Sequence, residues 1–85
     1  MNKRVYLFPN GFSREAEAMY GWLRNYNLTP SWGDCEPGKL AIDLPAGEVS
    51  CLLLMAEHNP ARFGNASQIR KHTVEYRALE EGAKP

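Results

Sequence analysis

Four side chains in this 85-residue sequence have the atom types of a zinc site: Cys35, Cys51, His58 and His72. Thiolate sulfur and imidazole nitrogen are the usual zinc ligands. Structural zinc sites draw these ligands from close pairs such as C-x2-C or H-x3-H. Because no two of the four residues are closer than seven positions, the spacing argues against a zinc site. We expect neither a metal nor another cofactor.

The side chains that could act in acid–base or nucleophilic catalysis are equally few. His58 follows Glu57, while Asp34, Asp43 and Cys35 lie in other parts of the sequence. Nucleophilic catalysis needs a nucleophile held by a base that a third group orients, and no serine or cysteine lies in a recognisable motif of that kind. The glycines are dispersed, so the sequence has no phosphate-binding glycine loop. We therefore expect that the protein is not an enzyme.

Charge is balanced over the whole chain but not along it. Ten basic and ten acidic residues give a formal net charge of zero. Basic residues outnumber acidic ones by four to two in residues 1–33 and by five to three in residues 58–85, whereas residues 34–57 hold one basic and five acidic residues. An acidic centre therefore separates two mildly basic segments.

Length and composition indicate one domain spanning residues 1–85. A content of 44% hydrophobic and 24% charged residues is ordinary for a globular chain of this size. The longest apolar run, Cys51–Ala56, is far shorter than the ~20 residues of a membrane-spanning helix, and the N-terminus lacks the apolar stretch of a signal peptide. Two cysteines without a signal peptide do not indicate a disulfide framework. These features predict a cytoplasmic protein with no membrane partner.

The pattern of apolar and turn residues predicts a strand, a helix and a hairpin in the first half of the chain. Lys3–Phe8 is rich in β-prone residues and is followed by turn residues. Apolar residues recur at helical spacing over residues 13–27, with Ser13 as the expected N-cap. Apolar and other residues alternate over 39–44, directly after a Glu-Pro-Gly turn, which predicts a hairpin of residues 29–36 and 39–44.

Two segments in the second half are ambiguous. Residues 49–58 read VSCLLLMAEH, which fits a buried strand or a helix. We favour the strand, because the Pro-Ala-Gly-Glu turn before it would make a second hairpin. Residues 67–81 fit a helix, which we favour, or a strand, because His72, Val74 and Tyr76 also alternate.

These elements predict a small α+β sandwich, a single domain in which an antiparallel sheet carries two helices on one face. We favour the order β-α-β-β-β-α, with the ferredoxin-like order β-α-β-β-α-β as the alternative.

The first strand indicates that the protein binds another macromolecule. Val5 and Leu7 would lie on one face of the sheet and Tyr6 and Phe8 on the other, while two helices cover one face only. A second copy of the chain, forming a homodimer, or a larger protein complex would cover the remaining face.

We therefore favour a small inhibitor or adaptor that acts on a larger host complex, as phage and mobile-element proteins do, with anti-CRISPR inhibitors as one example class. The acids Asp34, Glu36, Asp43 and Glu48 would imitate nucleic-acid charge and dock on a basic, nucleic-acid-binding groove of the partner. Trp32 would be the aromatic anchor of that interface.

An RNA-binding α+β domain is the alternative. Tyr6 and Phe8 would stack on bases, and the basic C-terminal residues Arg70, Lys71 and Arg77 would contact phosphates. Such binding would weaken steeply with salt, and the acidic centre would oppose it.

Overall fold

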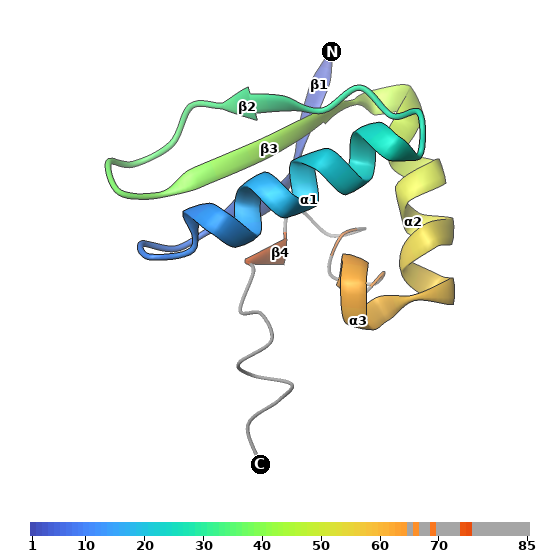
Figure 1. Ribbon diagram of the computed structural model, residues 1–85. Coiled ribbons are helices and arrows are strands. Elements are labelled where there is room, and N and C mark those ends of the chain that lie inside the picture. The colour runs from blue at the N-terminus through green and yellow to red at the C-terminus, as the bar shows by residue number, and fades with distance from the viewer. Residues whose placement is uncertain (65, 67–68, 70–73, 76–85) are drawn as a thin grey trace.

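The computed structural model describes residues 1–64, 66, 69 and 74–75 (Figure 1). The elements are, in order, β1 (Asn2–Phe8), α1 (Ser13–Asn25), β2 (Ser31–Gly33), β3 (Leu40–Pro45), the 3-10 turn η1 (Ala46–Glu48), α2 (Val49–His58), α3 (Pro60–Phe63) and β4 (Val74–Glu75). The strand order is β2-β3-β1-β4. β3 pairs antiparallel with both β1 and β2, and the short β4 runs parallel to β1. The predicted α+β class is confirmed.

α1 and the hairpin form where the sequence predicts them. Ala16, Met19 and Leu23 recur at helical spacing, and all three are buried. Ser13 is the first helical residue rather than the N-cap, because Phe12 takes the cap position without a side-chain hydrogen bond. β2 and β3 form the predicted hairpin, with a shorter first strand than expected.

The strand predicted over residues 49–58 is wrong, because this segment is the helix α2. Leu52 and Ala56, four positions apart, are its buried residues, and Leu54 between them is exposed. Leu, Met and Ala are strong helix formers, and the segment contains one β-branched residue, Val49. The 3-10 turn η1 turns the chain out of the sheet and into α2.

The favoured order β-α-β-β-β-α is wrong, because the elements that the structure describes follow the order β-α-β-β-α-α-β, which is closer to the ferredoxin-like alternative. Within residues 67–81 the structure describes Ile69, which is buried, and Val74–Glu75, which form β4. A strand at 74–75 agrees with the alternative prediction for this segment. The rest of the predicted final helix lies outside the described residues.

A β-bulge in the first strand changes the face of the sheet on which Val5 lies. The register between β1 and β3 shifts between Arg4 and Tyr6, so Val5 has no partner in β3. Val5, Tyr6 and Phe8 all belong to one buried cluster, whereas strict alternation predicted Val5 on the opposite face. Leu7, which is half-buried, is the one apolar residue that β1 leaves there. The second face therefore offers less apolar surface than the sequence suggested.

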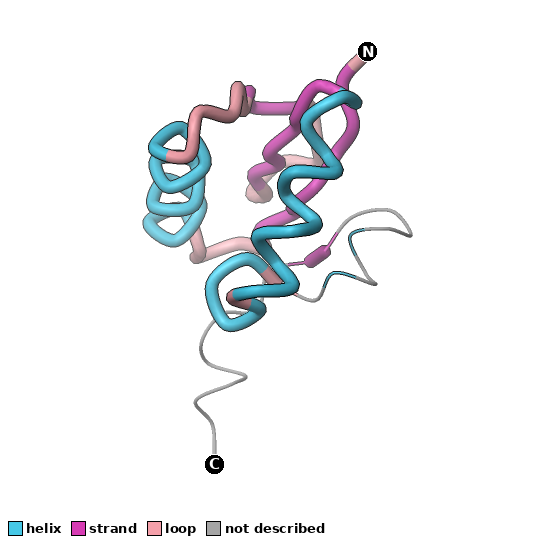
Figure 2. Tube along the Cα trace, turned by 90° about the vertical axis from the view of Figure 1, so that its right-hand side faces the viewer, coloured by secondary structure: helices cyan, strands magenta, loops and turns pink. Residues whose placement is uncertain are grey.

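The core is a single cluster between the sheet and the helices. Its largest fully buried side chains come from β1, β3, α1 and α2, and they are Tyr6, Phe8, Leu23, Ile42, Leu44, Leu52 and Val5. Burying one such apolar side chain stabilises the fold by ~1.5–3 kcal/mol. Figures 1 and 2 show α3 turning back beside the end of α2. No helix among the described residues is long and apolar enough to cross a lipid bilayer.

Candidate functional site

Trp32 is a large aromatic side chain that is both exposed and held in place. It lies in the middle of β2, opposite Ile42 of β3, and 45% of its surface is accessible. Its ring stacks on Tyr20 of α1, with ring centroids 4.6 Å apart and planes 11° apart. Because the stack fixes the indole before any partner arrives, Trp32 can bind with little loss of side-chain entropy.

Two of the predicted acids lie in the loop that follows Trp32. Asp34 and Glu36 are both exposed between β2 and β3. The loop closes through the Lys39 N–H, which donates to the Glu36 carbonyl (3.1 Å), and the Cys35 thiol, which donates to the Lys39 carbonyl (3.1 Å). The Glu36 carboxylate lies 3.4 Å from Lys39 Nζ. Trp32, Asp34 and Glu36 thus form one exposed region, which we name the hairpin surface.

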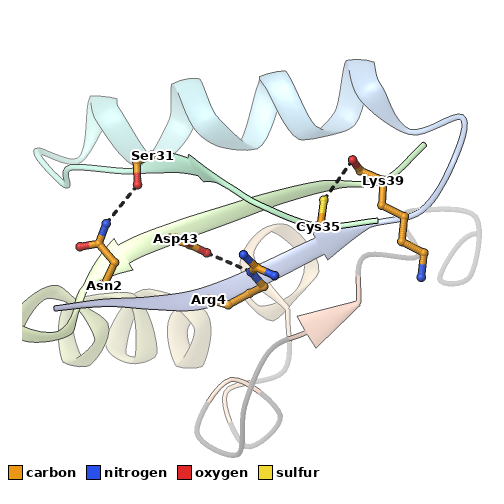
Figure 3. Close-up of polar contacts among 6 residues, drawn as sticks. All are labelled: Asn2, Arg4, Ser31, Cys35, Lys39 and Asp43. Carbon is orange, nitrogen blue, oxygen red and sulfur yellow. Dashed lines mark hydrogen bonds and ion pairs between the residues drawn. The ribbon is translucent and has the colours of Figure 1, made fainter. Parts of the chain in front are cut away.

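Asp43 lies on the other face of the sheet. Arg4 Nε donates to Asp43 Oδ1 at 3.1 Å, and both side chains are partly shielded from solvent (Figure 3). Asp43 pairs with Ser31 in the register, whereas Trp32 pairs with Ile42, so successive side chains point to opposite faces. Asp43 is therefore committed to an internal ion pair and is not part of the hairpin surface.

Glu48 has a structural contact as well. Its two carboxylate oxygens accept hydrogen bonds from the Thr29 N–H and the Thr29 hydroxyl, each at 2.6 Å. These bonds tie the chain entering β2 to the turn η1 before α2. Asp34 and Glu48 lie beyond opposite ends of β2, so the predicted set of four acids does not form one patch.

Cys35, Cys51 and His58, the described residues considered for a zinc site, do not come together as metal ligands. Cys35 and Cys51 are free and exposed, and His58 Nδ1 lies 3.0 Å from the Leu54 carbonyl of its own helix. Within the described part of the chain no group of three or more His, Cys, Asp or Glu side chains could hold a metal ion. His72 lies outside that part.

Of the residues proposed for RNA binding, the two that the structure describes are buried. Tyr6 and Phe8 are 0% exposed, so their rings are core residues and offer no face to a base. The Tyr6 hydroxyl donates to the Phe63 carbonyl, which fixes the ring inside the fold. The basic C-terminal residues of this alternative, Arg70, Lys71 and Arg77, lie outside the described residues.

A second aromatic region was not anticipated from the sequence. Trp22 of α1 and Tyr26, the residue directly after α1, have ring centroids 6.1 Å apart, and Tyr26 meets Phe63 of α3 edge-on at 5.8 Å. The Arg62 guanidinium lies 4.1 Å from the Trp22 ring centroid, in a cation–π contact. The i, i+4 spacing of Trp22 and Tyr26 was a visible signal. Their partners on α3 were not visible, because they depend on tertiary packing.

Two hollows flank this aromatic region and share Asn59. The first has a volume of about 310 Å³ and is lined by Glu15, Ala18, Met19, Trp22, Asn59, Ala61 and Arg62. The second has a volume of about 230 Å³ and is lined by Tyr26, Leu54, Met55, His58, Asn59 and Phe63. We name the two hollows together the α1–α3 groove.

Comparison with known proteins finds no family model, no characterised protein and no solved structure that matches the chain.

Proposed function

We propose that this protein is a small, non-enzymatic protein-binding module, an inhibitor or adaptor that docks on a larger complex through the hairpin surface. The observation that carries the proposal is the position of Trp32, whose ring is nearly half exposed yet stacked on Tyr20. Tryptophan is one of the residues most often found at binding hot spots. The fixed, exposed indole can therefore anchor a partner protein, and the two exposed carboxylates that follow it can form the charged rim of the interface.

The charge of the hairpin surface favours a basic partner. Asp34 and Glu36 leave two carboxylates within four positions of the anchor, and Lys39 balances one of them at 3.4 Å. Complementary charge at the rim raises the association rate and selects the partner. The anchor supplies most of the affinity once the partner buries it. A basic, nucleic-acid-binding groove of a protein complex is a partner of this kind, and phage or mobile-element inhibitors act on such grooves.

Asp43 and Glu48 have a different role in this proposal. Both carboxylates are engaged within the fold, Asp43 by Arg4 and Glu48 by Thr29. Asp43 thereby joins β3 to β1, and Glu48 joins η1 to the segment before β2. The docking residues are therefore reduced to Trp32, Asp34 and Glu36.

The test is an affinity pull-down from a host lysate with the full chain, performed with and without nuclease. We expect recovery of a protein complex that survives nuclease treatment and falls at least fivefold for Trp32→Ala, because truncating a hot-spot side chain costs more than ~1 kcal/mol. The control is Glu17→Lys, an exposed acid on α1 that is not one of the three residues of the hairpin surface. Recovery that disappears with nuclease, or that Trp32→Ala leaves unchanged, would refute the proposal, and the first result would instead favour RNA binding.

A further inference from the structure

We infer that the α1–α3 groove is a second docking site, which binds an amphipathic helix of a partner protein. The groove involves none of the three residues of the hairpin surface, so this inference does not rest on the proposed function.

The groove follows α1 over most of its length. Glu15, Met19 and Trp22 of α1 line it at spacings of four and three residues, which places them along one side of the helix, and Tyr26 follows directly after the end of α1. Eleven residues at a rise of 1.5 Å per residue span roughly 16 Å, which is three helical turns. The opposite wall is formed by the end of α2 and by α3. A groove between helices with this length matches a partner helix of about three turns.

The groove contains two kinds of side chain that are common at binding sites: hot-spot residues and flexible apolar residues. Trp22, Tyr26 and Arg62 belong to the three residue types most enriched at binding hot spots. Met55, which is partly buried, adds a flexible thioether side chain that can adjust to an incoming apolar group. Tyr26 is 49% exposed and Leu54 59% exposed, so apolar surface remains uncovered at this end of the groove.

The shape of the groove favours two successive apolar anchors over a single compact ligand. The two hollows of about 310 and 230 Å³ meet at Asn59. Small-molecule pockets have volumes of ~300–1,000 Å³ and enclose most of the ligand, whereas these hollows lie at or below the lower end of that range and are open to solvent. An amphipathic helix presents apolar side chains at i, i+4 and i+7, which can enter one hollow after the other.

Charge along the groove specifies the occupant further. Glu15 lies at one end, and Arg62 lies over Trp22 near the middle. Among the described residues neither forms an ion pair. Glu15 and Trp22 are seven residues apart on α1, so the matching helix carries a cation near one end and an anion about seven residues away.

The experiment is a titration of the full ¹⁵N-labelled chain with synthetic 14-residue peptides, followed by NMR. The matched peptide is an amphipathic helix with leucines at i, i+4 and i+7, a lysine near one end and an aspartate seven residues away. The control peptide replaces the aspartate with a second lysine. We expect the matched peptide to shift the signals of residues 15–26 and 54–63, including the Trp22 indole, and to leave the Trp32 indole unmoved. We expect the two-lysine peptide to bind about fivefold to tenfold more weakly, because in either direction one of its lysines lies beside Arg62.

Two substitutions complete the test. Arg62→Glu changes an exposed residue and makes both charges of the groove negative, so the two-lysine peptide should then bind more tightly than the matched one. Trp22→Ala should weaken binding at least fivefold, whereas Trp32→Ala, the matched control, should not affect it. Equal binding of both peptides, no reversal by Arg62→Glu, equal binding of a proline-containing peptide that cannot form a helix, or shifts confined to residues 31–36 would overturn the inference.

Discussion

At the scale of single residues, several polar side chains that resembled binding candidates hold the fold together. Gly33 shows how closely one such contact is packed. A Cβ atom at this position would lie 2.3 Å from Asp43 Oδ2 and 2.6 Å from Arg4 Nη2. The absence of a side chain on β2 therefore makes room for the ion pair between β1 and β3.

We predict that Gly33→Ala lowers the free energy of unfolding by about 1–2 kcal/mol, because the new methyl group displaces the Arg4–Asp43 pair. Gly21→Ala is the matched control, since a Cβ at this position of α1 meets nothing within 4 Å. Alanine is the better helix former, so this change should raise stability by about 0.5–1 kcal/mol. Denaturant unfolding of the two variants and the unchanged protein measures both changes in the free energy of unfolding. If Gly33→Ala were equally destabilising in an Asp43→Ala background, the packing explanation would be wrong.

At the scale of elements, the sequence predicted what local patterns determine and missed what tertiary packing decides. α1 has apolar residues at an unambiguous helical period, and the hairpin has alternation with a Glu-Pro-Gly turn, so both were predicted. A continuous apolar run such as Cys51–Ala56 fits the period of a helix and that of a strand equally well. The Pro-Ala-Gly-Glu turn before it was wrongly predicted to start a second hairpin. Nothing in the sequence of the first strand indicates the bulge at Val5. Each of these misses changes which face a side chain occupies.

The helical assignment of α2 gives a sharp stability prediction. Leu52 and Leu54 would share a face in a strand, but in α2 Leu52 is fully buried and Leu54 is exposed. Leu52→Ala should therefore cost about 2–5 kcal/mol in the free energy of unfolding. Leu54→Ala should change it by less than ~0.5 kcal/mol. Comparable losses for the two variants in a urea titration would contradict the helix and favour the predicted strand.

At the scale of the whole molecule, the acidic centre of the sequence is divided by the fold. Asp34 and Glu36 remain on the hairpin surface beside Trp32, whereas Asp43 and Glu48 are bonded to Arg4 and Thr29. Residue type and order were sufficient to single out Trp32 and the acids that follow it. They could not show which carboxylates find internal partners, because those partners come from distant segments. The α1–α3 groove required the same long-range information.

The most direct test of the central claim is the association rate of the chain with the protein that it retains from the lysate. We predict that Asp34→Lys combined with Glu36→Lys lowers the rate constant about tenfold at low salt, because the rim would then repel a basic partner. The difference should shrink at high salt, where exposed charges are screened. Glu17→Lys should have a much smaller effect, and unfolding curves should show that all variants fold. An unchanged rate for the double variant at low salt would remove the hairpin surface from the account.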